Sequence, residues 1–239
     1  MHLKDLTDYQ LSGKRVMLRA DMNVPLKHGI IDNAERIDRS LPTIKHILGE
    51  GGKIIVLSHL GRPQETGKVQ AEFSLKPVAE YLEEKLNMPI LLVEDLEVVK
   101  KSNEQFIMVE NIRFFKGEKG NDSNLAEKLG SLCDIFVMDA FATSHREHAS
   151  TTGVVSFVDH ACVGFLIREE LEALEFIDKA KRPILVILGG AKISTKLSLI
   201  NTLTEKADYL LLGGGIANTC LGSAGVEVGS SLIESSVFT

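Results

Sequence analysis

The sequence predicts an α/β protein in which a doubly wound, Rossmann-like parallel sheet carries helices on both of its faces. Short apolar runs of strand length recur along the chain, and amphipathic segments with a helical period lie between them. The runs are rich in Val, Ile and Leu and are not alternately polar, which is typical of parallel strands covered by helices on each side. Strands that alternate with helices in this way favour a doubly wound sheet.

Seven apolar runs are expected to form the strands of two domains. Five lie before a long helical segment, and two follow it. In chain order they are RVMLRA (15–20), KIIVLSH (53–59), ILLVED (90–95), FIMVEN (106–111), DIFVMDA (134–140), ILVILGG (184–190) and YLLLGG (209–214).

Amphipathic segments predict the helices that cover the first sheet. Residues 34–50, 74–86 and 125–132 have this character, and Ser74 is expected to cap the second helix with Pro77 in its first turn. The segment FLIREELEALEFIDKAK is strongly helical and ends before Arg182-Pro183. We therefore expect a first domain at 1–164, an interdomain helix at 165–182, and an incomplete second α/β domain at 183–239.

Composition restricts the classes of partner and compartment. The net charge is −6, with 27 basic against 33 acidic residues, so nucleic acid is not expected as the main partner. Three cysteines without a CxxC pair fit a reducing compartment. The first residues lack the apolar core of a signal peptide, and the apolar runs are too short to cross a bilayer. A cytoplasmic protein without a membrane or nucleic-acid partner is expected.

The first strand runs directly into polar residues. RVMLRADMNVP places Arg19, Asp21 and Asn23 at its carboxyl end, although a core cannot hold such groups unpaired. Solvated residues at the end of a strand would explain this pattern. A binding site is the alternative, because ligands of open α/β sheets collect at the carboxyl ends of the strands.

Cationic or hydrogen-bonding groups also follow other strands. SHLGRP supplies His59 and Arg62, ENIRFF supplies Arg113, and DAFATSHREH supplies Arg146. Each could be a solvated loop residue, but their convergence on one sheet edge would suit a small, multiply charged anion. His145 and His148 form an HxxH spacing, yet no matching ligand set accompanies them, so no metal site is expected.

Two glycine turns follow the last two strands. Gly189-Gly190 precedes a predicted helix on which Lys192 and Lys196 lie one turn apart, and a glycine turn at a helix N-terminus can hold phosphate. The second turn, Gly213 to Gly215, would allow a ligand to approach the backbone closely. Packing of helix on sheet explains either turn equally well, and neither matches a P-loop or a GxGxxG fingerprint.

Several motifs together resemble the phosphoglycerate kinase family over essentially the whole chain. They are RADMNVP, SHLGRP, ENIRF, DAFATSHREHAS, GGAKISTK and LGGGIANT, in the family's order and spacing. The resemblance implies a monomeric glycolytic kinase that transfers a phosphoryl group between 1,3-bisphosphoglycerate and ADP, giving 3-phosphoglycerate and ATP, with Mg²⁺ carried by the nucleotide. It also implies hinge closure between a phosphoglycerate domain and a nucleotide domain.

The resemblance further implies roles for individual residues. In the family's pattern, Asp21 and Asn23 match the groups that hold the glycerate hydroxyl and carboxyl end. Arg36, in AERIDRSLP, matches a catalytic arginine that also binds substrate. The phosphate-binding basic patch would be His59, Arg62, Arg113 and Arg146. Lys192 would contact the transferring phosphoryl group, and the nucleotide would meet Lys196, Gly213, Gly214 and Gly215.

Departures from the family pattern limit what is expected of the chain. Ala142 replaces a usual glycine, and Ser230 stands where lysine is common. Family members continue beyond residue 239 with an acidic residue for the ribose and a Gly-Gly-Asp-Thr turn, so the 239-residue chain alone is expected to be inactive. A non-catalytic phosphoglycerate-binding module is the alternative. A NAD-dependent dehydrogenase would need a fingerprint that is lacking after the first strand.

Overall fold

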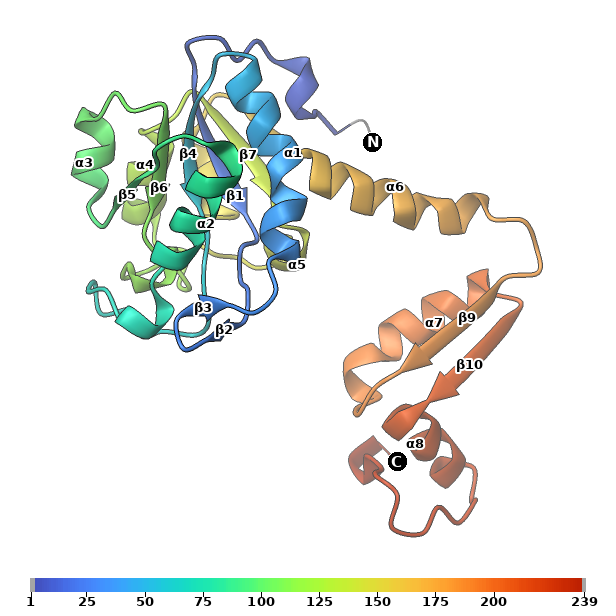
Figure 1. Ribbon diagram of the computed structural model, residues 1–239. Coiled ribbons are helices and arrows are strands. Elements are labelled where there is room, and N and C mark those ends of the chain that lie inside the picture. Colours follow the sequence, from blue (N-terminus) through green and yellow to red (C-terminus); the bar gives the residue numbers. More distant parts are fainter. Residues whose placement is uncertain (1–2, 238–239) are drawn as a thin grey trace. The chain divides into compact units, whose positions relative to one another are not determined.

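The computed structural model describes residues 3–237, with the side chains of residues 176–179 excepted. Contacts divide the chain into two compact units, Met1–Glu172 and Ala173–Thr239, and each is described by itself (Figure 1). The boundary falls inside the helix that was expected to connect two domains. Within the described residues, no helix is long and apolar enough to cross a membrane.

The first unit is built on a six-stranded parallel sheet with the order β5-β6-β4-β1-β7-β8. Its strands are β1 (Arg15–Ala20), β4 (Lys53–Leu57), β5 (Leu91–Val93), β6 (Phe106–Val109), β7 (Ile135–Asp139) and β8 (Ala161–Val163). The five predicted strands are confirmed, and β8 is an addition. A small antiparallel hairpin, β2 (Leu26–Lys27) with β3 (Ile30–Ile31), was not predicted either.

Helices cover both faces of this sheet, as the sequence predicts. α1 (Glu35–Gly49) and α2 (Lys76–Leu86) pack on one face, and α3 (Leu96–Lys101) and α4 (Ser123–Gly130) pack on the other. The other helices of the chain's first part are α5 (Phe141–Ser144) and α6 (Phe165–Lys179). Pro77 lies in the first turn of α2, but Ser74 does not cap that helix as a standard N-cap residue. Its hydroxyl donates to buried Glu110 (2.6 Å) while accepting from the Lys76 N–H (3.1 Å), and α2 begins two residues later than expected.

The core follows the alternation of side chains along the strands. In β1, Val16 and Leu18 belong to one apolar cluster with buried residues of α1 and α2, whereas Met17 belongs to a second cluster with residues of α3 and α4. All three side chains are fully buried. A strand whose successive residues are buried on opposite faces cannot show polar alternation, which explains the continuous apolar runs. The polar residues of β1, Arg15 and Arg19, lie near its two ends.

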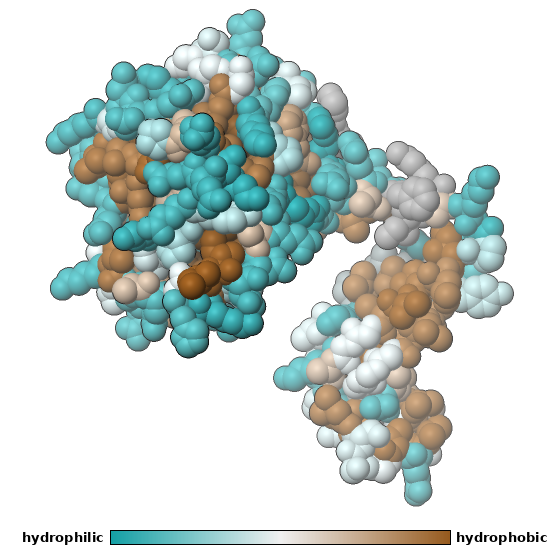
Figure 2. Space-filling view, in the orientation of Figure 1, coloured by the Kyte–Doolittle hydropathy of each residue, from teal (hydrophilic) through white to brown (hydrophobic). Residues whose placement is uncertain are grey.

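The second unit holds a two-stranded parallel sheet, β9 (Leu185–Gly189) with β10 (Tyr209–Gly213). After β9 come the 3₁₀ turn Ser194–Lys196 and α7 (Leu197–Lys206), and β10 leads into α8 (Gly214–Ser223). The helix expected directly after Gly190 thus begins later, so Lys192 lies before it and is not one helical turn from Lys196. Several large apolar side chains of this unit are exposed, as Figure 2 shows in brown.

Candidate functional site

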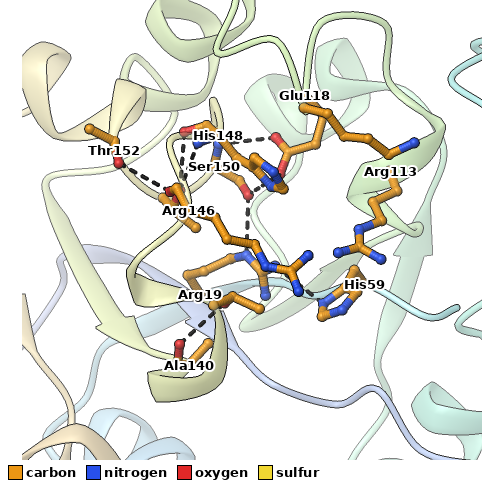
Figure 3. A network of polar contacts seen from close by, with 12 residues as sticks. Arg19, His59, Arg113, Glu118, Ala140, Arg146, His148, Ser150 and Thr152 are labelled. Carbon is orange, nitrogen blue, oxygen red and sulfur yellow. Dashed lines mark hydrogen bonds and ion pairs between the residues drawn. The ribbon is translucent and has the colours of Figure 1, made fainter. Parts of the chain in front are cut away.

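Polar side chains gather in the first unit where the carboxyl ends of β1, β4, β6 and β7 lie (Figure 3). After β1 the chain continues to β4 on one side of it, and after β6 it crosses to β7 on the other side, an arrangement that opens a crevice at strand ends. β1 carries Arg19, and the loops that follow the other strands carry His59, Arg113 and Arg146. Four chain segments therefore supply cationic or imidazole groups to one place.

Arg19 is a buried arginine, with 1% of its surface exposed. Its Nε donates to Ser150 Oγ (3.1 Å), its Nη1 to the Ala20 carbonyl oxygen (2.6 Å), and its Nη2 lies 3.3 Å from His59 Nδ1. Among the described residues, no carboxylate forms an ion pair with it. Burial lowers the pKa of Arg19, and Arg146 lowers it further, while Glu118 and Asp21 act in the opposite direction.

His59 is held as a neutral ring. Burial lowers its pKa to about 2, and the guanidinium groups of Arg19, Arg113, Arg146 and Arg36 lower it too. A protonated imidazole among four cations would be repelled by all of them. In the ligand-free chain the ring can therefore offer a hydrogen bond but no charge.

Arg113 is held beside the ring by the turn after β6. Asn111 caps that turn by accepting from the Arg113 N–H (3.2 Å), and its amide group donates to the carbonyl oxygens of Leu60 and Phe73 (both 2.8 Å). Arg113 Nη1 donates to the Gly61 carbonyl oxygen, whereas its buried Nε has no hydrogen-bond partner. Burial lowers the pKa of Arg113, as do Arg146 and Arg19. A buried donor without a partner costs free energy, and an anionic acceptor would remove that cost.

Asn23 connects the end of β1 to the loop after β4. Its Oδ1 accepts from the Gly61 N–H (2.8 Å), and Gly61 has φ of 60°. A Cβ at Gly61 would lie 2.5 Å from the Phe73 ring, so only glycine fits there. Arg62 follows on this loop with an exposed side chain and still lowers the pKa of Arg113, so it lies on the rim of the cluster.

Asp21 and Arg36 form the side of the site nearest α1. Arg36 Nη1 donates to Asp21 Oδ2 at 2.8 Å, and the aspartate is nearly buried while half of the arginine side chain is exposed. Asp21 Oδ1 also accepts from the Asn23 N–H (3.3 Å). The ion pair leaves the outer part of the Arg36 guanidinium accessible to a ligand.

Sequence reasoning missed two residues beneath the cluster, Glu118 and Ser150. The fully buried carboxylate of Glu118 accepts from the Ser150 N–H (3.0 Å) and from Ser150 Oγ (2.6 Å), and it lies 3.6 Å from His148 Nδ1. Arg19 was noticed at the end of its strand but was not assigned to the site. An arginine inside a buried strand was the available signal. Ser150 is the last residue of the motif DAFATSHREHAS but had no role assigned to it, and no local signal marked Glu118.

The seven residues assigned to the substrate from the sequence thus lie in the first unit, in one neighbourhood. Asp21 pairs with Arg36, and Asn23 and Arg113 hold the Gly61 loop. Arg62 and Arg146 act electrostatically on Arg113, and Arg146 also acts on His59. Three buried or half-buried arginines face two carboxylates there, Glu118 and Asp21, and Asp21 is already paired with Arg36. That surplus of positive charge can be balanced by a multiply charged anion.

The residues assigned to the nucleotide lie in the second unit. The Gly190 and Gly214 turns pack together: a Cβ at Gly215 would lie 2.5 Å from the Ala191 carbonyl oxygen, and the Ile216 N–H donates to the Gly190 carbonyl oxygen (3.0 Å). Gly213 has open space around it, and Lys196 Nζ lies near Gly190. Close packing of backbones accounts for the glycines at 214 and 215.

Lys192 is exposed in the turn after β9, beside a carboxylate. Glu234 accepts from the Ser194 N–H (3.0 Å) and Oγ (2.6 Å), and these bonds, together with Lys192, lower its pKa.

Nowhere in the described part of the chain do three His, Cys, Asp or Glu side chains group so as to hold a metal ion.

The chain is similar to known proteins over nearly all of its length. The family model described as "Phosphoglycerate kinase" matches residues 6–239. A phosphoglycerate kinase of Legionella pneumophila (strain Corby) is 52% identical over 236 residues, which cover 98% of this chain and 59% of that relative. The chain therefore spans about three fifths of the relative it matches.

Solved structures are similar as well. The structure of phosphoglycerate kinase from Coxiella burnetii matches with a TM-score of 0.89 and 45% identity, covering 99% of this chain and 61% of that one. The enzyme from Pyrococcus horikoshii OT3 matches with a TM-score of 0.79 and 30% identity, covering 94% of this chain and 58% of that one.

Proposed function

Because this chain belongs to the phosphoglycerate kinase family, we propose that it supplies the phosphoglycerate site and part of the nucleotide site of an enzyme that transfers a phosphoryl group between 1,3-bisphosphoglycerate and ADP. The products would be 3-phosphoglycerate and ATP, as in glycolysis. One observation carries the proposal: Arg19, Arg113 and Arg146 surround a neutral histidine at the carboxyl ends of the strands, with unpaired donor capacity.

The cluster would bind the phosphate that is not transferred. Arg62, Arg113 and Arg146 would contact its oxygens, and His59 would donate a neutral hydrogen bond. Asp21 and Asn23 would hold the glycerate hydroxyl and carboxyl end, where Asp21 already positions Arg36 at 2.8 Å. This arrangement fixes a three-carbon acid phosphate at both of its ends, which orients the carboxyl group that carries the reacting phosphoryl.

The transfer itself needs no base or covalent nucleophile. The bond between phosphorus and the carboxyl oxygen breaks, a bond to a terminal oxygen of ADP forms, and the substrate leaves as a carboxylate. The ADP oxygen is already ionised, so no proton moves. Catalysis then rests on positioning and on charge stabilisation, which Arg36 and Lys192 would supply to the transferring group.

The nucleotide would enter as its Mg²⁺ complex, and Lys196 and Gly213 to Gly215 would lie beside it. Lys196 Nζ already lies close to the Gly190 backbone in the turn where phosphate oxygens would bind. Exclusion of water from the acyl phosphate would require closure of the two units, with residues 164–181 in the hinge. We expect a cytoplasmic monomer.

Calorimetry on the 239-residue chain tests the proposed function. We expect heat with 3-phosphoglycerate, a weaker affinity at higher salt, and little heat with glycerate, which lacks the phosphate. An Arg62→Ala variant should bind more weakly, whereas Arg182→Ala, which removes an exposed arginine of the second unit, should bind like the wild type.

Turnover separates the kinase from a module that only binds. Because the chain spans 59% of its Legionella relative, we expect the 239 residues alone to bind 3-phosphoglycerate without forming ATP from 1,3-bisphosphoglycerate and ADP. Absence of heat with 3-phosphoglycerate would contradict both functions. ATP formation by the 239-residue chain would contradict the expected inactivity but not the kinase assignment.

A further inference from the structure

We propose that Glu118 and Ser150 are positioning residues: they hold Arg19, and through Arg19 they keep the His59 ring in its Nε2–H form, which can only donate a hydrogen bond to a ligand. None of the motifs discussed above assigns a role to Glu118 or Ser150. The consequence for a bound phosphate rests on the proposed function, whereas the state of the ring is a property of the ligand-free chain.

The first link of this network joins Glu118 to Ser150. Both residues are fully buried, and two hydrogen bonds connect them, from the Ser150 N–H to Oε2 (3.0 Å) and from Ser150 Oγ to Oε1 (2.6 Å). The Ala149 N–H also donates to the Glu118 carbonyl oxygen (2.9 Å). A hydroxyl group carries one proton, and Ser150 Oγ donates it to Glu118 Oε1, so that proton is committed to Glu118.

The second link joins Ser150 to Arg19. Since the Ser150 proton points to Glu118, the lone pairs of its hydroxyl oxygen are free to accept from Arg19 Nε at 3.1 Å. Arg19 Nη1 is fixed separately by the Ala20 carbonyl oxygen at 2.6 Å. A planar guanidinium that is held at two of its nitrogens has no freedom to turn, so the position of Nη2 is determined.

The third link joins Arg19 to His59. Arg19 Nη2 lies 3.3 Å from His59 Nδ1, and a guanidinium can donate but never accept. Nδ1 must therefore be the unprotonated nitrogen, which places the ring proton on Nε2. Burial lowers the pKa of His59 to about 2, and the cations Arg19, Arg113, Arg146 and Arg36 lower it too. A second proton on the ring is therefore disfavoured, although the carboxylates Glu118 and Asp21 lie in the same cluster.

The network makes the phosphate pocket a set of donors. In the described part of the chain, no hydrogen bond to His59 Nε2 is found, so its N–H remains for a ligand oxygen. Arg113 Nε, which is buried without a partner, is a second donor. A dianionic phosphate has only hydrogen-bond acceptors. Its monoanion carries a P–OH donor, for which a pocket made of donors provides no acceptor. The pocket should therefore prefer the dianion, whose formation has a pKa of about 6.

Nitrogen NMR of the ligand-free 239-residue chain tests the state of the ring directly. The signals of His59 are assigned by their absence from the His59→Gln variant. We expect Nδ1 to have the shift of an unprotonated ring nitrogen and Nε2 that of a protonated one, unchanged between about pH 5.5 and 8, where an ordinary histidine titrates. A proton on Nδ1, or titration of the ring in this range, would overturn the proposal.

A serine variant tests the positioning role. Ser150→Ala removes the acceptor for Arg19 Nε and should move the His59 ring nitrogens toward a mixture of the two neutral forms, with a dissociation constant for 3-phosphoglycerate about three- to tenfold higher. Ser131→Ala is the matched control, because this exposed serine donates only to the Lys128 carbonyl oxygen at the end of α4. Unchanged ring shifts in a folded Ser150→Ala variant would contradict the role of Ser150.

The two proposals fail in different ways. If the wild-type chain gives no heat with 3-phosphoglycerate, the proposed function fails, while the ring assignment still stands on the ligand-free spectra. If the ring is charged or protonated on Nδ1 while 3-phosphoglycerate binds normally, the positioning network fails and the proposed function survives.

Discussion

Replacing Arg113 by methionine should separate ligand affinity from stability. The Arg113 guanidinium is buried, and both Arg146 and Arg19 oppose its charge, as the lowered pKa of Arg113 indicates. Methionine keeps most of the apolar volume of the side chain and removes the charge. We therefore expect Arg113→Met to bind 3-phosphoglycerate far more weakly without lowering the free energy of unfolding of the ligand-free first unit.

The size of the affinity loss follows from the contacts of Arg113. Its Nη1 is occupied by the Gly61 carbonyl oxygen, and Nε is unpartnered, so the Nε–Nη2 edge can make two parallel bonds to a phosphate. A hydrogen bond to a charged group contributes about 1.5–3 kcal/mol. The loss of two amounts to about 3–6 kcal/mol, and the lower value corresponds to a roughly hundredfold increase in Kd.

Two opposing changes determine the free energy of unfolding of Arg113→Met. The variant loses the bond from Arg113 to Gly61, but Gly61 is only partly buried, so water can replace that donor. It also loses the unfavourable burial and repulsion of a cation that no carboxylate pairs with among the described residues. These effects offset one another, and the free energy of unfolding should not fall.

Calorimetry with 3-phosphoglycerate and urea unfolding measure the two quantities. Unfolding is followed by amide NMR signals of residues 3–172, because the two units need not unfold together. Arg15→Met is the matched control: Arg15 donates to the carbonyl oxygens of Val99 and Ser102 near the amino end of β1. It should lose stability and keep its affinity. If Arg113→Met instead lost stability and bound normally, the assignment of Arg113 to the anion site would be refuted.

Three further predictions concern α1 and the end of β7. Arg36→Ala should weaken 3-phosphoglycerate binding about tenfold and flatten its salt dependence in calorimetry, whereas Arg39→Ala, which removes ion pairs to α6, should not. Gly164→Ala would place a Cβ 2.3 Å from Asp139 Cγ, so urea unfolding should show a loss of about 1–3 kcal/mol, while Gly49→Ala, with open space around it, should cost nothing. Burial raises the pKa of Asp139, so its contribution to stability is full below about pH 4 and falls as the pH rises through its folded pKa. Between about pH 4 and 7, the free energy of unfolding measured in urea should therefore fall by more for the wild type than for Asp139→Asn.

The strands could be predicted because burial on both faces leaves a local mark in the sequence. RVMLRA coincides with β1, but KIIVLSH extends two residues beyond β4. Ser58 leaves the strand because its hydroxyl donates to the Ala20 carbonyl oxygen and accepts from the Met22 N–H (both 3.0 Å). β8, with only three residues, owes its existence to pairing with β7 and has no periodicity of its own. Elements that depend on a distant partner are invisible to local patterns.

The same distinction explains which site residues the sequence indicated. His59, Arg62, Arg113 and Arg146 could be placed together because parallel strands bring their carboxyl ends to one edge. Arg36 was found only through the family resemblance, since an exposed arginine on a helix resembles any solvated one. Glu118 was not found, because its hydrogen-bond partner Ser150 lies 32 positions away in the sequence and no motif contains both residues.

The arrangement of charge explains why such a site must be built on a rigid sheet. Arg19, Arg113 and Arg146 repel one another in the ligand-free chain, and Glu118 offsets only part of that repulsion. A flexible loop would relieve the strain by moving the cations apart, whereas Arg19 is fixed within β1 and Arg113 within a capped turn. The unfavourable energy would be recovered on binding of an anion, because a ligand at a hundred times its Kd stabilises the folded state by about 2.7 kcal/mol. The same cations would thus favour ligand binding and oppose ligand-free stability, and the carboxylates of Glu118 and Asp21 offset part of that opposition.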